Sequence, residues 1–140
     1  MIRFDHAPDG FEVTNGFNPR LNHVIARVDA EGKLLGGVTY EKFTGASITM
    51  HVRSFDKRWL TKDMLWVIFH YPFVRLGCEK VLGFTPSTLG DALAFAKHIG
   101  FIEEYRIEDA CPGGDLVVLS MRRADCRWLG IRPLGLRETP

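Results

Sequence analysis

The chain has 140 residues, of which 46% are hydrophobic and 25% charged, and this composition fits one globular domain. A formal net charge of +1 gives no overall attraction to nucleic acid or to a membrane surface. Because no apolar run approaches the roughly 20 residues that span a bilayer, and residues 1–6 lack the pattern of a secretory signal, we expect a cytoplasmic protein.

Turn-forming residues divide the first third of the chain into expected strands. Residues 1–22 contain several turn signals and few apolar residues, so no element boundaries are predicted there. Alternating side chains predict strands over 24–29 and 34–43, joined by a short turn. The pair Gly36-Gly37 in the second strand indicates a bulge or a close approach of another part of the chain.

The next expected strand, 46–55, alternates clearly between apolar and polar residues. Its period of two places three apolar side chains on the face expected against the core, namely Ile48, Met50 and Val52. The other face carries a row of four polar side chains: Ser47, Thr49, His51 and Arg53. Such a row in the middle of a sheet is expected in a cleft or under a polar cover.

A helix is expected over 62–76, after a polar turn. Thr61 is a suitable N-cap, the apolar residues follow helical spacing, and Gly77 fits the end of the helix. Pro72 lacks a backbone N–H, so it should kink this helix or mark its last turn.

The rest of the chain alternates between strands and helices. A strand is expected over 80–85, and a second helix begins at a capping-box-like pair, Thr88 and Asp91, and ends at Gly100. Further strands are expected over 101–108 and 116–121, with a turn over 110–114 between them and a short helix around 124–129.

This order of elements predicts an α/β (α+β) fold with a mixed sheet flanked by helices. Hairpin-linked strands come first, and crossover helices follow, which place parallel strands in the middle of the sheet. Open sheets of this kind bind ligands beyond the carboxyl ends of the parallel strands. We therefore expect a binding site where 46–55 and 80–85 end.

Two segments resemble the C-terminal half of GNAT acetyltransferases: 92–104, with a helix that ends in Gly100-Phe101, and 115–121, an apolar last strand. The likeness is nearest to the branch that acetylates ribosomal-protein N-termini. Residues 58–61 and 71–77 are similar to small GNAT-like proteins often encoded in phages and prophages. The resemblance covers about 24–122 and implies one GNAT domain over 1–140, with 123–140 as an extension and a mostly antiparallel sheet of about six to seven strands.

The resemblance implies an N-acyltransferase that moves an acetyl group from acetyl-CoA to a primary amine on a small molecule, a protein or a nucleic-acid base. Met50 and Val52 would offer backbone groups to the pantetheine arm, and Thr85 and Ser87 would border the cofactor slot. The pyrophosphate would lie at the loop and helix start, where free N–H groups and positive side chains favour an anion. That segment comprises Asp56, Lys57, Arg58, Trp59, Leu60, Thr61 and Lys62.

Three positions depart from the family's pattern. Residues 56–61 contain no glycine, and Trp59 keeps the backbone further from a phosphate than glycine would. Leu89 stands where many relatives have asparagine, and Ala96 where many have a tyrosine that protonates the departing thiolate. The alternative is therefore a catalytically inactive GNAT-fold module that binds a host protein or a nucleic acid.

His51 is the first candidate for chemistry, because histidine can take a proton from an amine near neutral pH. The alternative is a structural histidine bonded to a neighbouring strand. Glu41 could be the base instead, through water, or a solvated edge residue. Tyr105 or Tyr40 could replace the missing acid, or pack against the sheet.

The C-terminal region is basic, with Trp128 among its arginines, and suits either a nucleic-acid surface or a solvated segment. These arginines are Arg122, Arg123, Arg127, Arg132 and Arg137. Neither the histidines nor the three cysteines have metal-site spacing, so no metal is expected and the thiols should be reduced. The sequence leaves a homodimer open and does not identify the acceptor.

Overall fold

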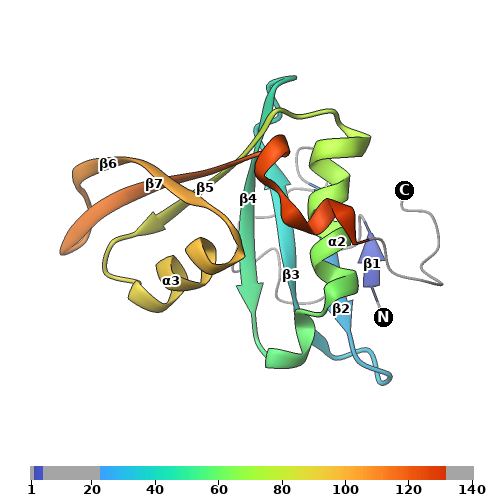
Figure 1. The fold of residues 1–140 in the computed structure, drawn as a ribbon. Helices are drawn as coiled ribbons and strands as arrows, with labels where there is room; N and C mark the ends of the chain where they lie inside the picture. Colours follow the sequence, from blue (N-terminus) through green and yellow to red (C-terminus); the bar gives the residue numbers. More distant parts are fainter. Residues whose placement is uncertain (1, 5–22, 132–140) are drawn as a thin grey trace.

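The computed structural model describes residues 2–4 and 23–131, which form a seven-stranded sheet in the order β1-β2-β3-β4-β5-β7-β6 (Figure 1). Neighbouring strands are antiparallel except β4 and β5, which are parallel. The strands are β1 (Ile2–Phe4), β2 (His23–Val28), β3 (Leu34–Glu41), β4 (Ser47–Ser54), β5 (Lys80–Pro86), β6 (Ile102–Cys111) and β7 (Gly114–Arg122). The predicted mixed sheet with a central parallel pair is confirmed. The unassigned segment 5–22, and Arg132 and Arg137, lie outside the described residues.

Two helices cover the same face of the sheet, α2 (Lys62–His70) beside β3 and β4, and α3 (Gly90–Ile99) beside β5 (Figure 1). The Thr61 hydroxyl accepts the N–H of Met64, so the predicted N-cap of α2 is confirmed. The predicted kink at Pro72 takes the form of a π-helical turn, η2 (Tyr71–Arg75). This wider turn accommodates a residue that cannot donate, and Gly77 follows with φ of 70°.

The start of α3 differs from the prediction. The helix begins at Gly90 with Leu89 at the N-cap position, and not at Thr88. The physical reason is the preceding turn, in which Ser87 bonds to Asp115 through its backbone N–H (2.8 Å) and its hydroxyl (2.8 Å). These bonds fasten the turn to β7 and delay the helix. Its predicted end at Gly100 is confirmed, with φ of 118°.

Two short 3-10 turns, η3 (Arg123–Asp125) and η4 (Arg127–Gly130), stand where one helix was predicted around 124–129. The Trp128 indole N–H donates to the carbonyl of Ile99 (2.8 Å), and Arg127 Nη2 donates to that of His98 (2.6 Å). Arg127 also stacks on the Trp128 ring at 4.2 Å. Both side chains therefore cap the carbonyl end of α3, where positive charge is favourable.

The main core lies between α2 and strands β3 and β4. The hydroxyl of buried Tyr40 donates to the carbonyl of Ile68 on α2. The close approach predicted at Gly36-Gly37 is confirmed, because a Cβ on Gly36 would lie 2.7 Å from Trp59 Cγ. The close approach of Trp59 therefore requires a glycine. The bulge lies one residue earlier, at Leu35, where the pairing passes from Arg27–Gly36 to Val28–Leu34.

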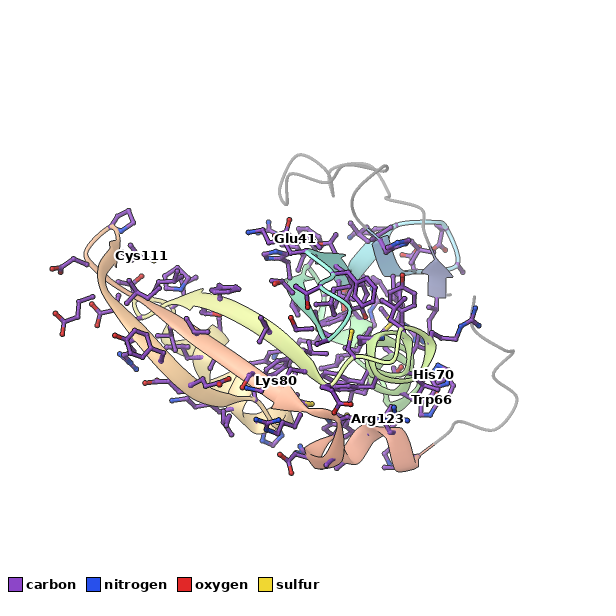
Figure 2. All side chains as sticks on the ribbon, turned by 90° about the horizontal axis from the view of Figure 1, so that it is seen from above. Glu41, Trp66, His70, Lys80, Cys111 and Arg123 are labelled. Atoms are coloured by element: carbon purple, nitrogen blue, oxygen red, sulfur yellow. The ribbon has the colours of Figure 1, made fainter. Side chains whose placement is uncertain are left out.

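The β6–β7 hairpin projects from this core, with Cys111 near its tip (Figure 2). Residues 102–110 of β6 are all exposed. Among the described strands, β6 is the edge of the sheet and pairs with β7 alone. In the described part of the chain, no helix has both the length and the apolar character needed to cross a membrane.

Candidate active site

The parallel strands β4 and β5 separate after a short contact. They pair at only three positions, the last of which joins Thr49 to Leu82. Beyond it, β4 stays paired with β3 up to Ser54 and β5 stays paired with β7 up to Pro86. The backbone groups of residues 50–54 that face β5 therefore have no strand partner in the described sheet, and they can bond to an extended ligand.

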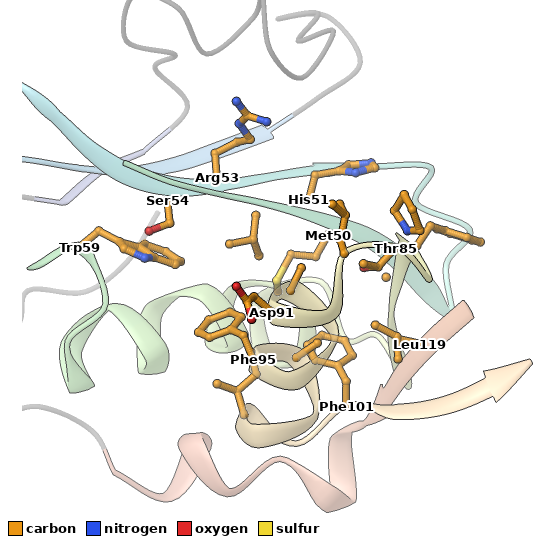
Figure 3. A pocket seen from close by; sticks show the side chains of 18 of the residues that line it. Met50, His51, Arg53, Ser54, Trp59, Thr85, Asp91, Phe95, Phe101 and Leu119 are labelled. Atoms are coloured by element: carbon orange, nitrogen blue, oxygen red, sulfur yellow. The ribbon is translucent and has the colours of Figure 1, made fainter. Parts of the chain in front are cut away.

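A cavity of about 860 Å³ occupies the space where the strands separate, with α3 beside it (Figure 3). Its walls are mostly apolar, as expected for a slot that holds a small-molecule arm. The lining residues are Met50, His51, Val52, Arg53, Ser54, Lys57, Trp59, Gly83, Phe84, Thr85, Pro86, Leu89, Asp91, Ala92, Phe95, Ala96, Ile99, Phe101 and Leu119.

Val52 corrects one prediction from the alternation of β4. Ile48 and Met50 are buried as expected, but Val52 is 37% exposed. The apolar face of β4 passes from the core into the cavity after Thr49, because β5 no longer lies alongside. Only the first half of the strand therefore packs like core.

His51 and Glu41 form a pair, with 2.6 Å between His51 Nε2 and Glu41 Oε1. Their side chains are 34% and 31% exposed, so solvent reaches the pair but does not surround it. In the tautomer in which His51 Nε2–H donates to Glu41, the lone pair of the imidazole lies on Nδ1. The two residues predicted as alternative bases thus belong to one arrangement.

The side of the sheet on which His51 lies matters for access. Figure 3 shows His51 and Arg53 on one side of β4, and Trp59 and Phe95 of the cavity on the other. This follows from the alternation of β4, which directs odd-numbered side chains away from α3. The gap between β4 and β5 therefore connects an apolar side with a polar side that carries a basic nitrogen.

Thr39 adds a polar atom that the sequence did not identify. It lies directly opposite His51 in the β3–β4 register and is 1% exposed, and its Oγ1 has no hydrogen-bond partner among the described residues. A buried hydroxyl without a partner is costly, so this atom has bonding capacity for a water molecule or ligand. Its position two residues before Glu41, on the same strand face, is the signal that could have identified it.

The loop after β4 forms a compact turn. Asp56 accepts hydrogen bonds from the guanidinium of Arg58 and from its backbone N–H, and these bonds, the guanidinium first, lower the pKa of Asp56 to about 2. Trp59 is buried against Gly36. The hydroxyl of Thr61 also accepts from Arg27 Nη1 (3.0 Å), which ties the loop to β2.

The structure places six of the predicted site residues in the cavity wall: Met50, His51, Val52, Lys57, Trp59 and Thr85. The other predicted residues lie outside the described lining, namely Glu41, Asp56, Arg58, Leu60, Thr61, Lys62, Ser87 and Tyr105. Glu41 still reaches the site through His51. Tyr105 is 68% exposed on the edge strand β6, so the structure does not bring it to the cavity.

Tyr40 is also absent from the described cavity lining, and its hydroxyl is already bonded to Ile68. Burial raises its pKa well above the ordinary value, with a smaller contribution from Tyr71. Among the described residues, no group of three or more His, Cys, Asp or Glu side chains could hold a metal ion. The three cysteines are free thiols.

Sequence comparison did not identify relatives: no protein-family model matches the chain, and no curated protein matches it. Solved structures do match. A mutant of spermidine N-acetyltransferase SpeG from Vibrio cholerae shares 13% identity over 85% of this chain and 73% of its own, with a TM-score of 0.67. A second mutant of that enzyme shares 14% over 84% and 72%, with a TM-score of 0.66. A GNAT-family acetyltransferase from Bacillus anthracis shares 13% over 72% and 65%, with a TM-score of 0.57.

The chain therefore has the GNAT fold, as the resemblance of its C-terminal half implied. The likeness to the ribosomal-protein branch and to phage-encoded proteins stays a prediction from the sequence. The homodimer, the cytoplasmic location and the domain limits also stay predictions.

Proposed function

We propose that this protein is an N-acyltransferase that moves an acetyl group from a thioester donor, acetyl-CoA, to a primary amine. The proposal rests on one observation, the separation of β4 and β5 after Thr49. The resulting gap has an apolar slot on one side and the His51–Glu41 pair on the other. The acetyltransferases with the same fold support it.

The slot suits the acyl-pantetheine arm of the donor. The unpaired backbone of β4, at Met50 and Val52, can bond to the amides of an extended arm, while Phe95, Phe101 and Leu119 provide apolar surface. The donor would supply an acyl group that is already activated as a thioester. The chain would hold its carbonyl beside the gap, which is the orienting contribution of an acyltransferase.

The amine would approach from the side of β4 that carries His51. His51 Nδ1 takes a proton from the amine, and Glu41 stabilises the imidazolium that forms. The amine nitrogen then bonds to the carbonyl carbon, and the carbon–sulfur bond breaks with release of a thiolate. A thiol ionises near pH 8.5 and is a good leaving group, so this step does not depend on a tyrosine at position 96, which is Ala96.

The test compares the turnover of His51→Gln with that of the unaltered protein, using acetyl-CoA and a panel of amines that includes a polyamine and a peptide N-terminus. Release of the CoA thiol measures the rate. We expect kcat at neutral pH to fall about 100-fold to 10,000-fold, because a general base usually accelerates a reaction by that factor. The defect should shrink as the pH approaches the value at which the amine loses its proton without help, about 10 for an alkyl amine and about 8 for a peptide N-terminus. Glu41→Gln should cause a smaller loss.

His98→Gln is the matched control, because His98 is exposed on α3 and is absent from the described cavity lining. Its turnover should equal that of the unaltered protein. Full turnover by His51→Gln would refute the assignment of the base.

The compact loop at Asp56–Trp59 favours one alternative, a non-catalytic GNAT-fold module that binds a protein or a nucleic acid. The two functions predict different responses to the donor. Millimolar acetyl-CoA should raise the unfolding temperature by several degrees if the slot binds it, because a ligand of the native state stabilises that state. The absence of any shift would favour the non-catalytic module.

A further inference from the structure

The outer face of the sheet, which is the face turned away from α2 and α3, is apolar in its second half. Val118 of β7 lies between Val117 and Leu119, which are buried in the core, so its own side chain is on the outer face. It pairs with Phe84 of β5 on one side and with Tyr105 of β6 on the other. Paired residues of neighbouring strands lie on the same face, so these three side chains form one row. Phe84 is 39% exposed, Tyr105 is 68% exposed and Val118 is half-buried.

The next row, nearer the tip of the β6–β7 hairpin, is also apolar. Leu116 of β7 pairs with Pro86 of β5 and with Ile107 of β6, which is 44% exposed. The two rows together form what we call the outer patch, which consists of Phe84, Val118, Tyr105, Leu116 and Ile107. Contiguous apolar surface that is open to solvent marks a place where a ligand or a partner binds.

The outer patch begins at the gap beside His51. The last pair that joins β4 to β5 is Thr49 with Leu82, and both strands continue beyond it. Two residues further along each strand, alternation places His51 and Phe84 on the outer face, on opposite sides of the gap. Both residues line the cavity, so the cavity opens through the gap onto the outer face. A group bound at His51 therefore has the outer patch as its neighbour across the gap.

The charges of the outer face favour an acceptor with a single ammonium group. Two carboxylates of this face are already paired, Glu41 with His51 (2.6 Å) and Glu104 with Lys80 (2.7 Å). Arg53 lies two residues beyond His51 on the same face, roughly 7 Å along β4. Among the described residues, no carboxylate forms an ion pair with Arg53. A second ammonium near His51 would therefore be repelled, because salt screens charges only beyond about 8 Å at physiological ionic strength.

We infer that the amine acceptor of this protein is a monoamine with an apolar chain. Its nitrogen lies beside His51, and its chain lies on the outer patch. The inference rests on the proposed function and names the class of acceptor for that site. Neighbouring strands are about 4.8 Å apart, so the patch extends roughly 10 Å from Phe84 to Tyr105, which is room for a chain of several carbons.

The first experiment measures kcat/KM for butylamine, hexylamine and octylamine, with acetyl-CoA as the donor. These amines carry the same charge and differ only in the length of the apolar chain. A chain on an open face buries about half of each methylene group, so kcat/KM should rise about twofold per methylene, or about 15-fold from butylamine to octylamine. A rise of less than about twofold from butylamine to octylamine would overturn the inference.

The variant Val118→Thr tests whether the outer patch produces this rise. Threonine is branched like valine and suits a strand, so the fold should be kept while one apolar contact becomes polar. The ratio of kcat/KM for octylamine to that for butylamine should fall about threefold. Val74→Thr is the matched control, because Val74 is 44% exposed on η2, at the end of α2, and its ratio should equal that of the unaltered protein. Thermal unfolding checks that both variants fold, and equal ratios in the two would contradict the inference.

The second experiment compares octylamine with spermidine, which has several ammonium groups. We expect kcat/KM to be at least about tenfold lower for spermidine, because its charges face Arg53 and are poorly placed on an apolar surface. Arg53→Gln should raise the ratio of spermidine to octylamine about threefold, and added salt should raise it as well. A preference of the unaltered protein for spermidine would overturn the inference.

A second copy of the chain is the competing occupant of the outer patch, and light scattering tests it. We expect the unaltered protein, Val118→Thr and Val74→Thr to have the same mass in solution. A dimer that dissociates in Val118→Thr, while the ratio of octylamine to butylamine is unchanged, would assign the patch to a second copy and overturn the inference.

Equilibrium binding of the amines separates this inference from the proposed function. If amines are acetylated with kcat/KM independent of chain length, the inference fails and the function stands. If no amine is acetylated but octylamine binds about 15-fold more tightly than butylamine, and Val118→Thr reduces this preference, the proposed function fails and the assignment of the outer patch stands. If neither acetylation nor the preference is observed, both fail.

Discussion

The two halves of the sheet differ in how deeply their side chains are buried. In the first half, β2, β3, β4 and α2, six consecutive residues of β3 and six of the nine residues of α2 are buried. In the second half, β5, β6, β7 and α3, only two residues of α3 are buried and none in β6. Figure 2 shows the same contrast, with side chains crowded around α2 near Trp66 and the hairpin extending away toward Cys111.

The candidate site lies between these halves, where the parallel pairing ends. The first half holds the polar groups, because the His51–Glu41 pair needs two strands in fixed register. The second half supplies an apolar wall, for which exact register matters less. The two halves contact each other at Phe69 of α2, whose ring centre lies 6.1 Å from that of Phe101. Stability thus resides mainly in the half that positions the chemistry.

The same substitution in each half should have very different effects on stability. Ile68 is 1% exposed on α2 and Ile102 is 63% exposed on β6. Ile68→Ala removes buried methyl groups and leaves a cavity, so the free energy of unfolding should fall by about 2–5 kcal/mol. Ile102→Ala should stay within about 0.5 kcal/mol of the unaltered protein. Urea unfolding of the two variants measures the difference, and equal losses would contradict the contrast between the halves.

Much of the fold could be predicted because its signals are local. Thr61 marks the start of α2 through its own hydroxyl, and Gly77 and Gly100 mark helix ends through the positive φ that glycine tolerates. The alternation of β4 shows in eight consecutive residues. The starting point of α3 could not be predicted, because it depends on Ser87 and its bonds to Asp115 on another strand. The sequence around Thr88 does not show a contact with a residue so far along the chain.

The candidate site was less predictable than the fold, for a related reason. His51 and Glu41 were identified separately, and only the β3–β4 register, which sets Glu41 opposite Thr49, brings their side chains together. Tyr105 is a candidate acid by residue type alone. Its place on the edge strand, away from the cavity, depends on the strand order, which its local sequence does not show. The absence of glycine from residues 56–61 marks the loop after β4 as unusual, but the bonds from Arg58 to Asp56 depend on the conformation of the turn.

A glycine in each half offers a second matched comparison. A Cβ on Gly37 of β3 would lie 2.5 Å from the carbonyl oxygen of Ile25, whereas a Cβ on Gly83 of β5 would meet nothing nearer than Leu119 Cβ at 3.8 Å. Gly37→Ala should therefore destabilise by about 1–3 kcal/mol, because backbone atoms have to move. Gly83→Ala should be neutral or stabilise by up to about 1 kcal/mol, since alanine restricts the unfolded chain. Thermal unfolding distinguishes them, and a tolerated Gly37→Ala would show that β3 is less tightly packed than its burial indicates.

The smallest of these effects at neutral pH compares two tyrosines. Tyr40→Phe removes the buried hydroxyl that donates to Ile68, which should cost about 0.5–1.5 kcal/mol, whereas Tyr105→Phe, on exposed β6, should cost nothing measurable.

The effect of Tyr40 should change sign at alkaline pH. Tyrosine in the unfolded chain ionises near pH 10, but burial and then the neighbouring Tyr71 raise the pKa of folded Tyr40 well above that value. Above pH 10 the unfolded chain therefore binds fewer protons than the folded one, and the unaltered protein loses about 1.4 kcal/mol of stability per pH unit at this site. Tyr40→Phe lacks this loss, so the difference between the two proteins should shrink and then reverse above pH 10. Parallel curves of unfolding free energy against pH would show that Tyr40 ionises as readily when folded, and hence that the inner face of β3 is not closed to water.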